Sequence, residues 1–163
     1  MRDIMGLILT GENDAYLREL TLSRAVAALP VIGRYRVIDF QMSNLVNANV
    51  RNVGVITQRN YHSLMDHLGS GKEWDLHGKH DGLFLLPPFL TRDNVGVYKG
   101  MLDALRSNIG YLSRSRQEYV LLSDSHVIYN IDYTSFFDDP GITRKGAAFI
   151  RNSDTRTSVA VIN

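Results

Sequence analysis

The sequence predicts an α/β protein whose mostly parallel sheet has helices on both faces. Three observations support this fold class: short apolar runs that suit buried parallel strands, amphipathic segments between those runs, and the regular alternation of the two. The clearest runs are Gly6 to Leu9, Asn52 to Thr57 and Tyr119 to Leu122. Because parallel strands need long crossovers, the segments between the runs are expected to cover the sheet.

The composition fits one domain, or part of a larger one, with an ordinary packed core. The 163 residues are 44% hydrophobic, carry a formal net charge of +1 and include no cysteine. No sustained basic face indicates a nucleic-acid or membrane partner, and no apolar stretch approaches the ~20 residues that a membrane span needs. We therefore expect a soluble cytoplasmic protein.

The first half of the chain shows two helical patterns separated by the second strand. Thr21 to Leu29 has the length for one or two helical turns, which Pro30 ends, and the segment up to Pro30 is expected to be mostly loop. Apolar residues at helical spacing predict a helix from about Ile38 to Ala48. After the second strand, Tyr61 to Leu68 is expected to form a short amphipathic helix.

The second half begins with a long segment that is loop-like until Phe84-Leu85-Leu86, which two prolines end. Gly96 to Gly110 carries an apolar stripe typical of a helix. Phe136 to Gly141 reads as a turn, and Thr157 to Ile162 as one more strand. A strand with little after it leads us to expect that the chain is the front part of a longer protein.

The segment after the first strand lies where an α/β protein places a phosphate site. Such loops use glycines for close backbone approach and cations or a helix N-terminus to hold negative charge. Here Gly11 is the only glycine, and Glu12 and Asp14 bring negative charges. The position suits a nucleotide and the residues do not, so we expect a nucleotide-handling fold with a degraded catalytic loop.

Polar residues also follow the other two strands, at the carboxyl ends where open α/β sheets bind ligands. They are Gln58-Arg59-Asn60 and Ser123-Asp124-Ser125-His126. His77 and His80 have acidic neighbours, but their spacing fits no recognised metal-ligand motif, and exposed loop histidines are the commoner interpretation. No metal site is predicted.

Many of these motifs together resemble the bacterial and plant glucose-1-phosphate adenylyltransferases. The matching positions run from about Gly6 to Tyr133 and include Arg24-Ala25, Pro30, Gly33 to Phe40, Ser43-Asn44, Asn47, Gly54 to Gln58, Leu86-Pro87-Pro88, Tyr98, Gly100 and Asp103-Ala104. The resemblance implies a three-layer, Rossmann-like nucleotidyltransferase domain. Residues 1–163 would be its N-terminal portion, without the family's sugar-binding half and C-terminal β-helix.

Active members of this family use Mg²⁺ to join ATP and glucose 1-phosphate into ADP-glucose and pyrophosphate. The resemblance places Ser125 where those members carry a metal-ligating Asp, and Asp124 could replace it only by moving one position along the strand. It also implies a degenerate nucleotide or substrate site with no catalytic residue and no certain cofactor. The residues implied are Thr10, Gly11, Arg24, Gln58, Gly100, Asp103 and Ser125.

Two arginines are candidates for binding an anionic effector. Arg34 and Arg36 flank the start of the predicted helix, although half-exposed arginines are also common there. Asp39 could simply pair with Arg36 across one helical turn, which is worth only about 0.2–0.5 kcal/mol.

A preserved scaffold with a degraded loop resembles the non-catalytic, regulatory type of subunit found in some low-GC Gram-positive bacteria. We expect a catalytically silent subunit that forms a hetero-oligomer, a tetramer, with an active catalytic subunit in glycogen synthesis. ATP, ADP-glucose or a phosphosugar is the expected effector class. Two alternatives remain open: a slow but genuine adenylyltransferase, and a free-standing module that binds a nucleotide or phosphosugar.

Overall fold

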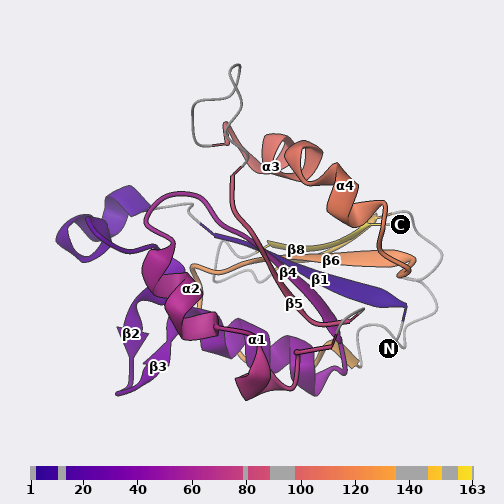
Figure 1. Cartoon of the computed structure of the whole chain (residues 1–163), viewed down its shortest axis with the longest axis horizontal. Helices are drawn as coiled ribbons and strands as arrows, with labels where there is room; N and C mark the ends of the chain where they lie inside the picture. The colour runs from indigo at the N-terminus through magenta and orange to yellow at the C-terminus, as the bar shows by residue number, and fades with distance from the viewer. Residues whose placement is uncertain are drawn as a thin grey trace.

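The computed structural model contains a six-stranded sheet with the strand order β5-β4-β1-β6-β8-β7 (Figure 1). It describes residues 3–10, 14–78, 81–88, 98–134, 147–151 and 158–162, without the side chains of 14–16, 147–151 and 158–162. The strands are β1 (Ile4–Leu9), β4 (Asn52–Ile56), β5 (Leu83–Leu86), β6 (Tyr119–Asp124), β7 (Ala147–Arg151) and β8 (Ser158–Ile162).

The sheet is mostly parallel, as the sequence predicts. β5, β4, β1 and β6 pair in parallel, whereas β8 runs antiparallel to both β6 and β7. A separate antiparallel pair, β2 (Pro30–Val31) and β3 (Tyr35–Arg36), precedes the first α-helix. The α/β class with a mostly parallel sheet is therefore confirmed.

Helices cover both faces of the sheet and give three layers. Figure 1 shows α1 (Val37–Asn47) and α2 (His62–Leu68) on one face, and α3 (Met101–Ser107) and α4 (Ile109–Leu112) on the other. Three 3₁₀ segments complete the described elements: η1 (Asp14–Thr21), η2 (Val26–Ala28) and η3 (Lys72–Trp74). No described helix has the length and apolar character required to cross a bilayer.

Alternate residues of the central strands enter two apolar cores. Ile8, Val55 and Leu121 pack with α1 residues such as Leu45. Leu7, Ile56 and Leu122 instead pack with Tyr98 and Ala104, on the face of α3 and α4. These strands read as continuous apolar runs because both of their faces are buried.

Gly54 is required where α4 packs most closely on the sheet. A Cβ atom at this position of β4 would lie 2.8 Å from Tyr111 Cε1 and 2.9 Å from Leu7 Cδ1. Only a residue without a side chain lets the Tyr111 ring approach the strand.

Two predicted segments differ from the structure. Phe84 to Leu86, for which no strand was predicted, belongs to β5, because its apolar side chains pack on both cores beside β4. The single helix predicted from Gly96 to Gly110 is two short helices that meet at Asn108. The Asn108 side chain is buried and donates to the Ala104 carbonyl at 2.8 Å, so it competes with the regular helical hydrogen bonds.

The remaining predictions have mixed outcomes. The helix from about Ile38 to Ala48 and the last strand are confirmed within two residues at each end. The interval from Thr21 to Leu29 contains the end of η1, the short 3₁₀ segment η2 and otherwise bends and loop, as the expectation of a mostly loop-like segment predicts. The turn predicted at Phe136 to Gly141 lies outside the described residues, and β7 was not predicted at all.

Candidate functional site

The carboxyl ends of β4, β1 and β6 meet at one edge of the sheet. In the strand register, Leu9 lies beside Ile56 on one side and Asp124 on the other. The ladder continues one residue further, because the Thr10 N–H donates to the Ile56 carbonyl at 3.0 Å and the Ser125 N–H donates to the Leu9 carbonyl at 3.1 Å. Residues of the predicted site from three distant segments are thus brought together at the edge where such folds bind ligands.

Thr10 and Ser125 are buried at this edge rather than presented on its surface. Their exposed fractions are 1% and 2%. The Thr10 hydroxyl donates to the Ile56 carbonyl at 3.0 Å, so it serves the sheet itself. Gly11, the remaining glycine of the degraded loop, lies outside the described residues.

The carboxylate at the end of β6 has partners inside the protein. Asp124 Oδ1 lies 2.9 Å from His126 Nδ1 and accepts the Ser125 N–H at 3.1 Å. Mg²⁺ requires several oxygen ligands in near-octahedral geometry and is usually bound through carboxylates. With Asp124 paired and a buried serine beside it, the described residues at this edge do not fit a Mg²⁺ site. His126 is the member of this group whose role sequence reasoning missed.

Gln58 is a half-exposed polar side chain at this edge that makes no side-chain hydrogen bond within the described residues. It follows β4 by two residues, after Ile56 and the fully buried Thr57. Ile56 belongs to the apolar core on the α3 face, so strand alternation directs Gln58 to the same face. An amide here could donate to, or accept from, a heterocyclic base.

Gly100 and Asp103 lie at the start of α3 and have local structural roles. Asp103 Oδ2 accepts the Lys99 N–H at 3.0 Å, which satisfies a donor at the helix N-terminus. The Gly100 backbone is extended, with φ at 162°, and a Cβ atom there would meet nothing within 4 Å. Among the described residues, neither backbone conformation nor packing requires a glycine at this position.

Arg24 is held near the same edge by an asparagine that sequence reasoning did not single out. The Asn60 side-chain amide donates to the Thr21 carbonyl at 3.1 Å and the Leu22 carbonyl at 3.2 Å, and the Asn60 carbonyl accepts the Ala25 N–H. Asn60 has a positive φ of 53°, which asparagine tolerates better than most residues. The half-buried Arg24 is thereby tied to the loop that carries Gln58.

The two effector candidates have different environments around a groove of about 550 Å³ between β3, α1 and α2. Arg34 is exposed, and its guanidinium lies 5.9 Å from the ring centroid of Tyr35. Arg36 donates from Nη1 to the carbonyl and the hydroxyl of Ser63, the latter at 2.7 Å. Asp66 and Glu73 also line the groove, so an anion there would meet both signs of charge.

Asp39 pairs with Arg36, but through the Arg36 backbone N–H and not as an ion pair with the guanidinium. Asp39 Oδ2 accepts the Arg36 backbone N–H at 2.9 Å, and Asp39 Oδ1 lies 2.6 Å from His67 Nε2. The aspartate therefore caps α1 and joins it to α2. His67, which tertiary packing brings from α2, lies closer to the Asp39 carboxylate than the Arg36 N–H does.

A buried polar network supports the segment that follows β6. The Gln41 amide donates to the Tyr133 hydroxyl at 3.0 Å, the Tyr133 and Tyr129 hydroxyls are 2.9 Å apart, and Asn44 donates to the Tyr129 carbonyl. Burial raises the pKa of Tyr133, and the neighbouring Tyr129 adds to the rise. Burial likewise raises the pKa of Tyr129. Both phenols therefore remain protonated and link α1 to this segment.

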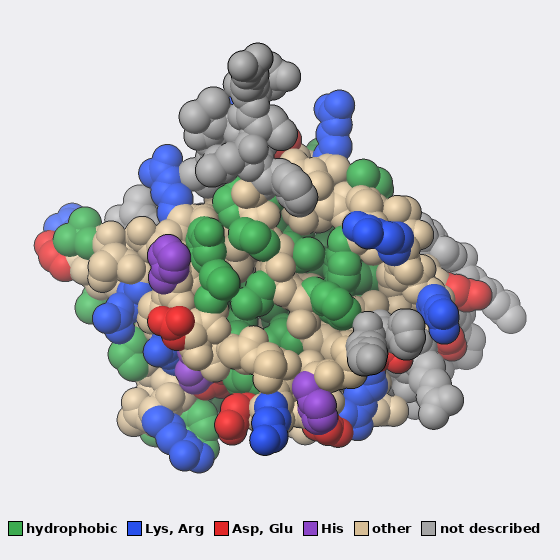
Figure 2. Space-filling model, viewed as in Figure 1, with side chains coloured by type: hydrophobic (Ala, Val, Ile, Leu, Met, Phe, Trp, Pro, Cys, Tyr) green, Lys and Arg blue, Asp and Glu red, His purple; other side chains and the backbone are tan. Residues whose placement is uncertain are grey.

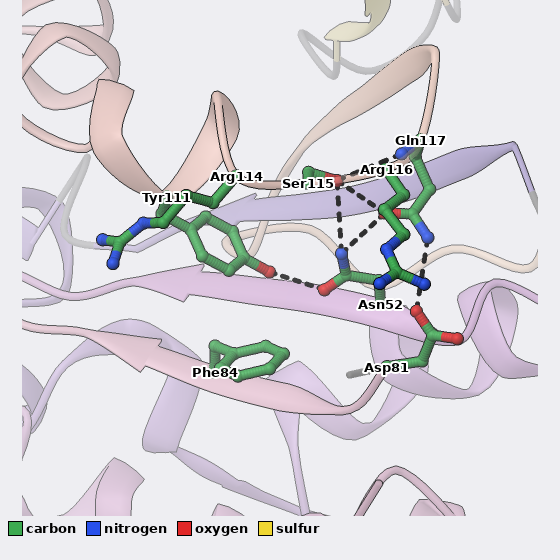
Figure 3. A pocket seen from close by; sticks show the side chains of 8 residues that line it. All are labelled: Asn52, Asp81, Phe84, Tyr111, Arg114, Ser115, Arg116 and Gln117. Atoms are coloured by element: carbon green, nitrogen blue, oxygen red, sulfur yellow. Dashed lines mark hydrogen bonds between the residues drawn. The ribbon is translucent and has the colours of Figure 1, made fainter. Parts of the chain in front are cut away.

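A second polar cluster lies at the opposite, amino-terminal end of the strands, beside a pocket of about 410 Å³ (Figure 3). Asn52 accepts the Tyr111 hydroxyl at 2.8 Å and donates to Gln117 at 2.8 Å and to Ser115 at 3.4 Å. Burial raises the pKa of Tyr111. Figure 3 shows these side chains converging on Asn52, whereas the Arg114 guanidinium points away. The polar groups of this cluster hydrogen-bond to one another, and the cluster lies at the opposite end of the strands from the ligand-binding edge.

The histidines considered for a metal site do not gather with other ligands in the described part of the chain. His77 Nδ1 lies 3.7 Å from Asp75 Oδ1, and His80 falls outside the described residues. No group of three or more His, Cys, Asp or Glu side chains that could hold a metal was found among the residues described.

The fold and the edge define the class: a three-layer α/β protein with ligand-binding potential at the carboxyl ends of its parallel strands. The model of the nucleotidyl transferase family matches residues 5–157. The chain belongs to this family.

Similarity to individual proteins narrows the comparison. The chain is 47% identical over 120 residues to the glycogen biosynthesis protein GlgD of Bacillus subtilis, which covers 72% of the chain and 34% of that protein. It is 41% identical over 121 residues to GlgD of Geobacillus stearothermophilus, with the same two coverages. Against the glucose-1-phosphate adenylyltransferase of Clostridium novyi it is 33% identical over 162 residues, covering 99% of the chain and 40% of that protein. The matched region thus spans between a third and two fifths of these relatives.

Proposed function

We propose that this chain is part of a regulatory, catalytically silent subunit of glucose-1-phosphate adenylyltransferase that acts in glycogen synthesis. The similarity to two proteins named for glycogen biosynthesis, and to adenylyltransferases, supports the pathway. The observation that carries catalytic silence is the pairing of Asp124 with His126 beside the buried Ser125. Nucleotidyl transfer depends on preorganised charge around the phosphates, and losing one such group typically costs about 10²–10³ in rate.

The proposed ligand is a nucleotide or phosphosugar bound weakly at the carboxyl edge. Gln58 is half-exposed there, Gly100 leaves space, and Arg24 is held nearby. Glu12 and Asp14 add negative charge to the adjacent loop and oppose the binding of a triphosphate. Arg34 is the better of the two effector candidates, because the Arg36 guanidinium is hydrogen-bonded to Ser63.

The proposed partner is an active catalytic subunit of the same family in a hetero-tetramer. A silent subunit can still alter its partner's activity if its binding favours one conformation of the partner over another. The intact α1–α2 connection through Asp39 and His67, and the network at Tyr133, would keep the scaffold ready for docking. This would account for a preserved scaffold beside a site that lacks a metal-binding carboxylate.

The test measures ADP-glucose formation from ATP, glucose 1-phosphate and Mg²⁺. We expect the full-length protein alone to show no turnover above a protein-free blank, and to change the saturation curve or activator response of the organism's own adenylyltransferase on mixing. Turnover by the protein alone that disappears in Gln58→Ala would establish the slow enzyme instead. An unchanged partner curve together with an unchanged apparent mass would leave only the free-standing binding module.

A further inference from the structure

Asn60 joins the loop after β4 to the segment after β1 through three hydrogen bonds. Its side-chain amide donates to the Thr21 carbonyl at 3.1 Å and to the Leu22 carbonyl at 3.2 Å. Its backbone carbonyl accepts the Ala25 N–H at 3.2 Å. Two of these partners precede Arg24 in the sequence and one follows it, so Asn60 holds the Arg24 backbone from both sides.

The side-chain bonds of Asn60 matter most on the side that precedes Arg24. The segment after Arg24 is anchored by burial, because Ala25 to Ala28 all belong to the buried core. Leu22 is instead 77% exposed. Apolar burial therefore does not fix this part of the chain, and the Asn60 amide does.

Asn60 also fixes the spacing between Arg24 and Gln58. It follows Gln58 by two residues and has a φ of 53°. Asparagine adopts this left-handed conformation more readily than most residues other than glycine. Because Gln58 closely follows the buried strand β4, a residue so near to it holds the Arg24 segment at a set distance from the strand end.

Arg24 carries a positive charge that the described part of the chain does not neutralise. Figure 2 shows Lys and Arg side chains mostly toward the margins of the molecular face, where water solvates them. Arg24 is half-buried, and no described side chain forms a hydrogen bond or ion pair with its guanidinium. Partial burial weakens the screening of a charge by water. This guanidinium therefore favours an anion that can accept two parallel hydrogen bonds, such as a phosphate.

We propose that Asn60 is a positioning residue that makes the carboxyl edge select a ligand with both a heterocyclic base and a phosphate. The Gln58 amide can donate to and accept from the base, and the Arg24 guanidinium binds the phosphate. A nucleoside or a free phosphate uses only one of these contacts. A nucleotide uses both, and it gains most when their spacing is fixed before binding. This inference rests on the proposed function for the nucleotide at this edge, and it is independent of catalytic silence.

Calorimetric titration of the full-length protein with adenosine and with ADP tests this role. ADP is chosen over ATP because the negative loop after β1 opposes a triphosphate. The parent should bind ADP at least about tenfold more tightly than adenosine, as expected for hydrogen bonds to a charged group. Asn60→Gly keeps the left-handed backbone and removes both side-chain donors. It should keep the adenosine affinity within about twofold and lose the preference for ADP.

A double-variant cycle shows whether Asn60 acts through Arg24. Arg24→Gln should lose the same preference for ADP, and combining it with Asn60→Gly should weaken ADP binding no further. Asn60→Asp retains the size of the side chain but cannot donate to the two carbonyls when ionised. It should therefore repeat the result of Asn60→Gly without the added backbone freedom of glycine.

Asn49→Gly is the matched control, because Asn49 is also exposed with a positive φ, of 58°, and lies before the other end of β4. This variant should keep both affinities of the parent. Equal weakening of adenosine and ADP binding in Asn60→Gly would mean a purely structural role and overturn the proposal. A retained preference for ADP in Asn60→Gly, or losses that add in the double variant, would overturn it as well. A parent that binds neither probe would reject the nucleotide of the proposed function, and this role with it.

Discussion

The two ends of β4 carry the same chemical group in opposite circumstances. Asn52 begins the strand, is 4% exposed, and has its amide hydrogen-bonded to Tyr111, Ser115 and Gln117. Gln58 follows the other end, is half-exposed, and makes no side-chain hydrogen bond within the described part of the chain. A buried amide with three partners contributes to stability, whereas a half-exposed amide at a carboxyl edge is available to a ligand.

The first prediction concerns Asn52, at the buried end of β4, and has the largest expected effect on stability. Asn52→Ala should lower the free energy of unfolding by about 2–3 kcal/mol, because it removes a buried amide with three partners and leaves the half-buried Tyr111 hydroxyl without its acceptor. Urea denaturation at neutral pH measures the change. Arg116→Ala, an exposed side chain beside the same pocket, serves as the control and should stay within about 0.5 kcal/mol of the parent. Equal effects from both substitutions would contradict the assignment.

The comparison also shows which parts of the fold the sequence can predict. β1, β4 and β6 are recognisable because both of their faces are buried, so their apolar runs are unbroken. No strand was predicted at β5, because its apolar run is short and two prolines follow it at once. The break at Asn108 was missed because the apolar stripe continues through Ile109, while the side chain that interrupts the helix bonds to a residue one turn back.

Residues of the candidate site were predicted by position better than by role. Topology alone places Gln58 and Asp124 at one edge, because parallel strands end together there. Whether a side chain at that edge is buried or paired depends on tertiary packing. Thr10 is used by the sheet, Asp39 is bound to His67 from another helix, and Asp124 is paired with His126. The partners of Thr10 and Asp39 lie far away in the sequence, whereas His126 lies only two residues after Asp124.

A second prediction uses alkaline pH to test the tyrosines whose pKa burial raises. Burial raises the pKa of Tyr111, Tyr129 and Tyr133 above the usual value of about 10. A raised folded-state pKa means that the associated stability is complete below pH 10 and is lost as the pH rises above it, because the unfolded phenols ionise first. Each such phenol should remove up to about 1.4 kcal/mol per pH unit.

Tyr111→Phe isolates the contribution of the Asn52 cluster to this pH dependence. Unfolding free energies measured by urea denaturation between pH 9 and pH 11 should fall less steeply in the variant, by up to about 1.4 kcal/mol per unit. Tyr35→Phe, at a residue that is 50% exposed, should follow the parent curve. Parallel curves for the parent and Tyr111→Phe would mean that this phenol is free to ionise in the folded protein.

The smallest expected effect on stability belongs to the exposed end of the comparison. Gln58→Ala should change the free energy of unfolding by less than about 0.5 kcal/mol, because it removes a half-exposed side chain whose amide makes no hydrogen bond within the described residues. The same substitution should reduce the thermal stabilisation that millimolar ATP or ADP-glucose gives the protein, since a ligand stabilises only in proportion to its binding to the folded state. Differential scanning fluorimetry with and without nucleotide measures both quantities on one sample.

Asn52→Ala serves as the control and should show the opposite result. It should lower the melting temperature without nucleotide and keep the full nucleotide-induced shift, because its cluster lies at the opposite end of the strand. A loss of more than about 1 kcal/mol in Gln58→Ala would assign this amide a structural role like that of Asn52. A nucleotide shift that Gln58→Ala leaves intact would place any nucleotide away from the carboxyl edge.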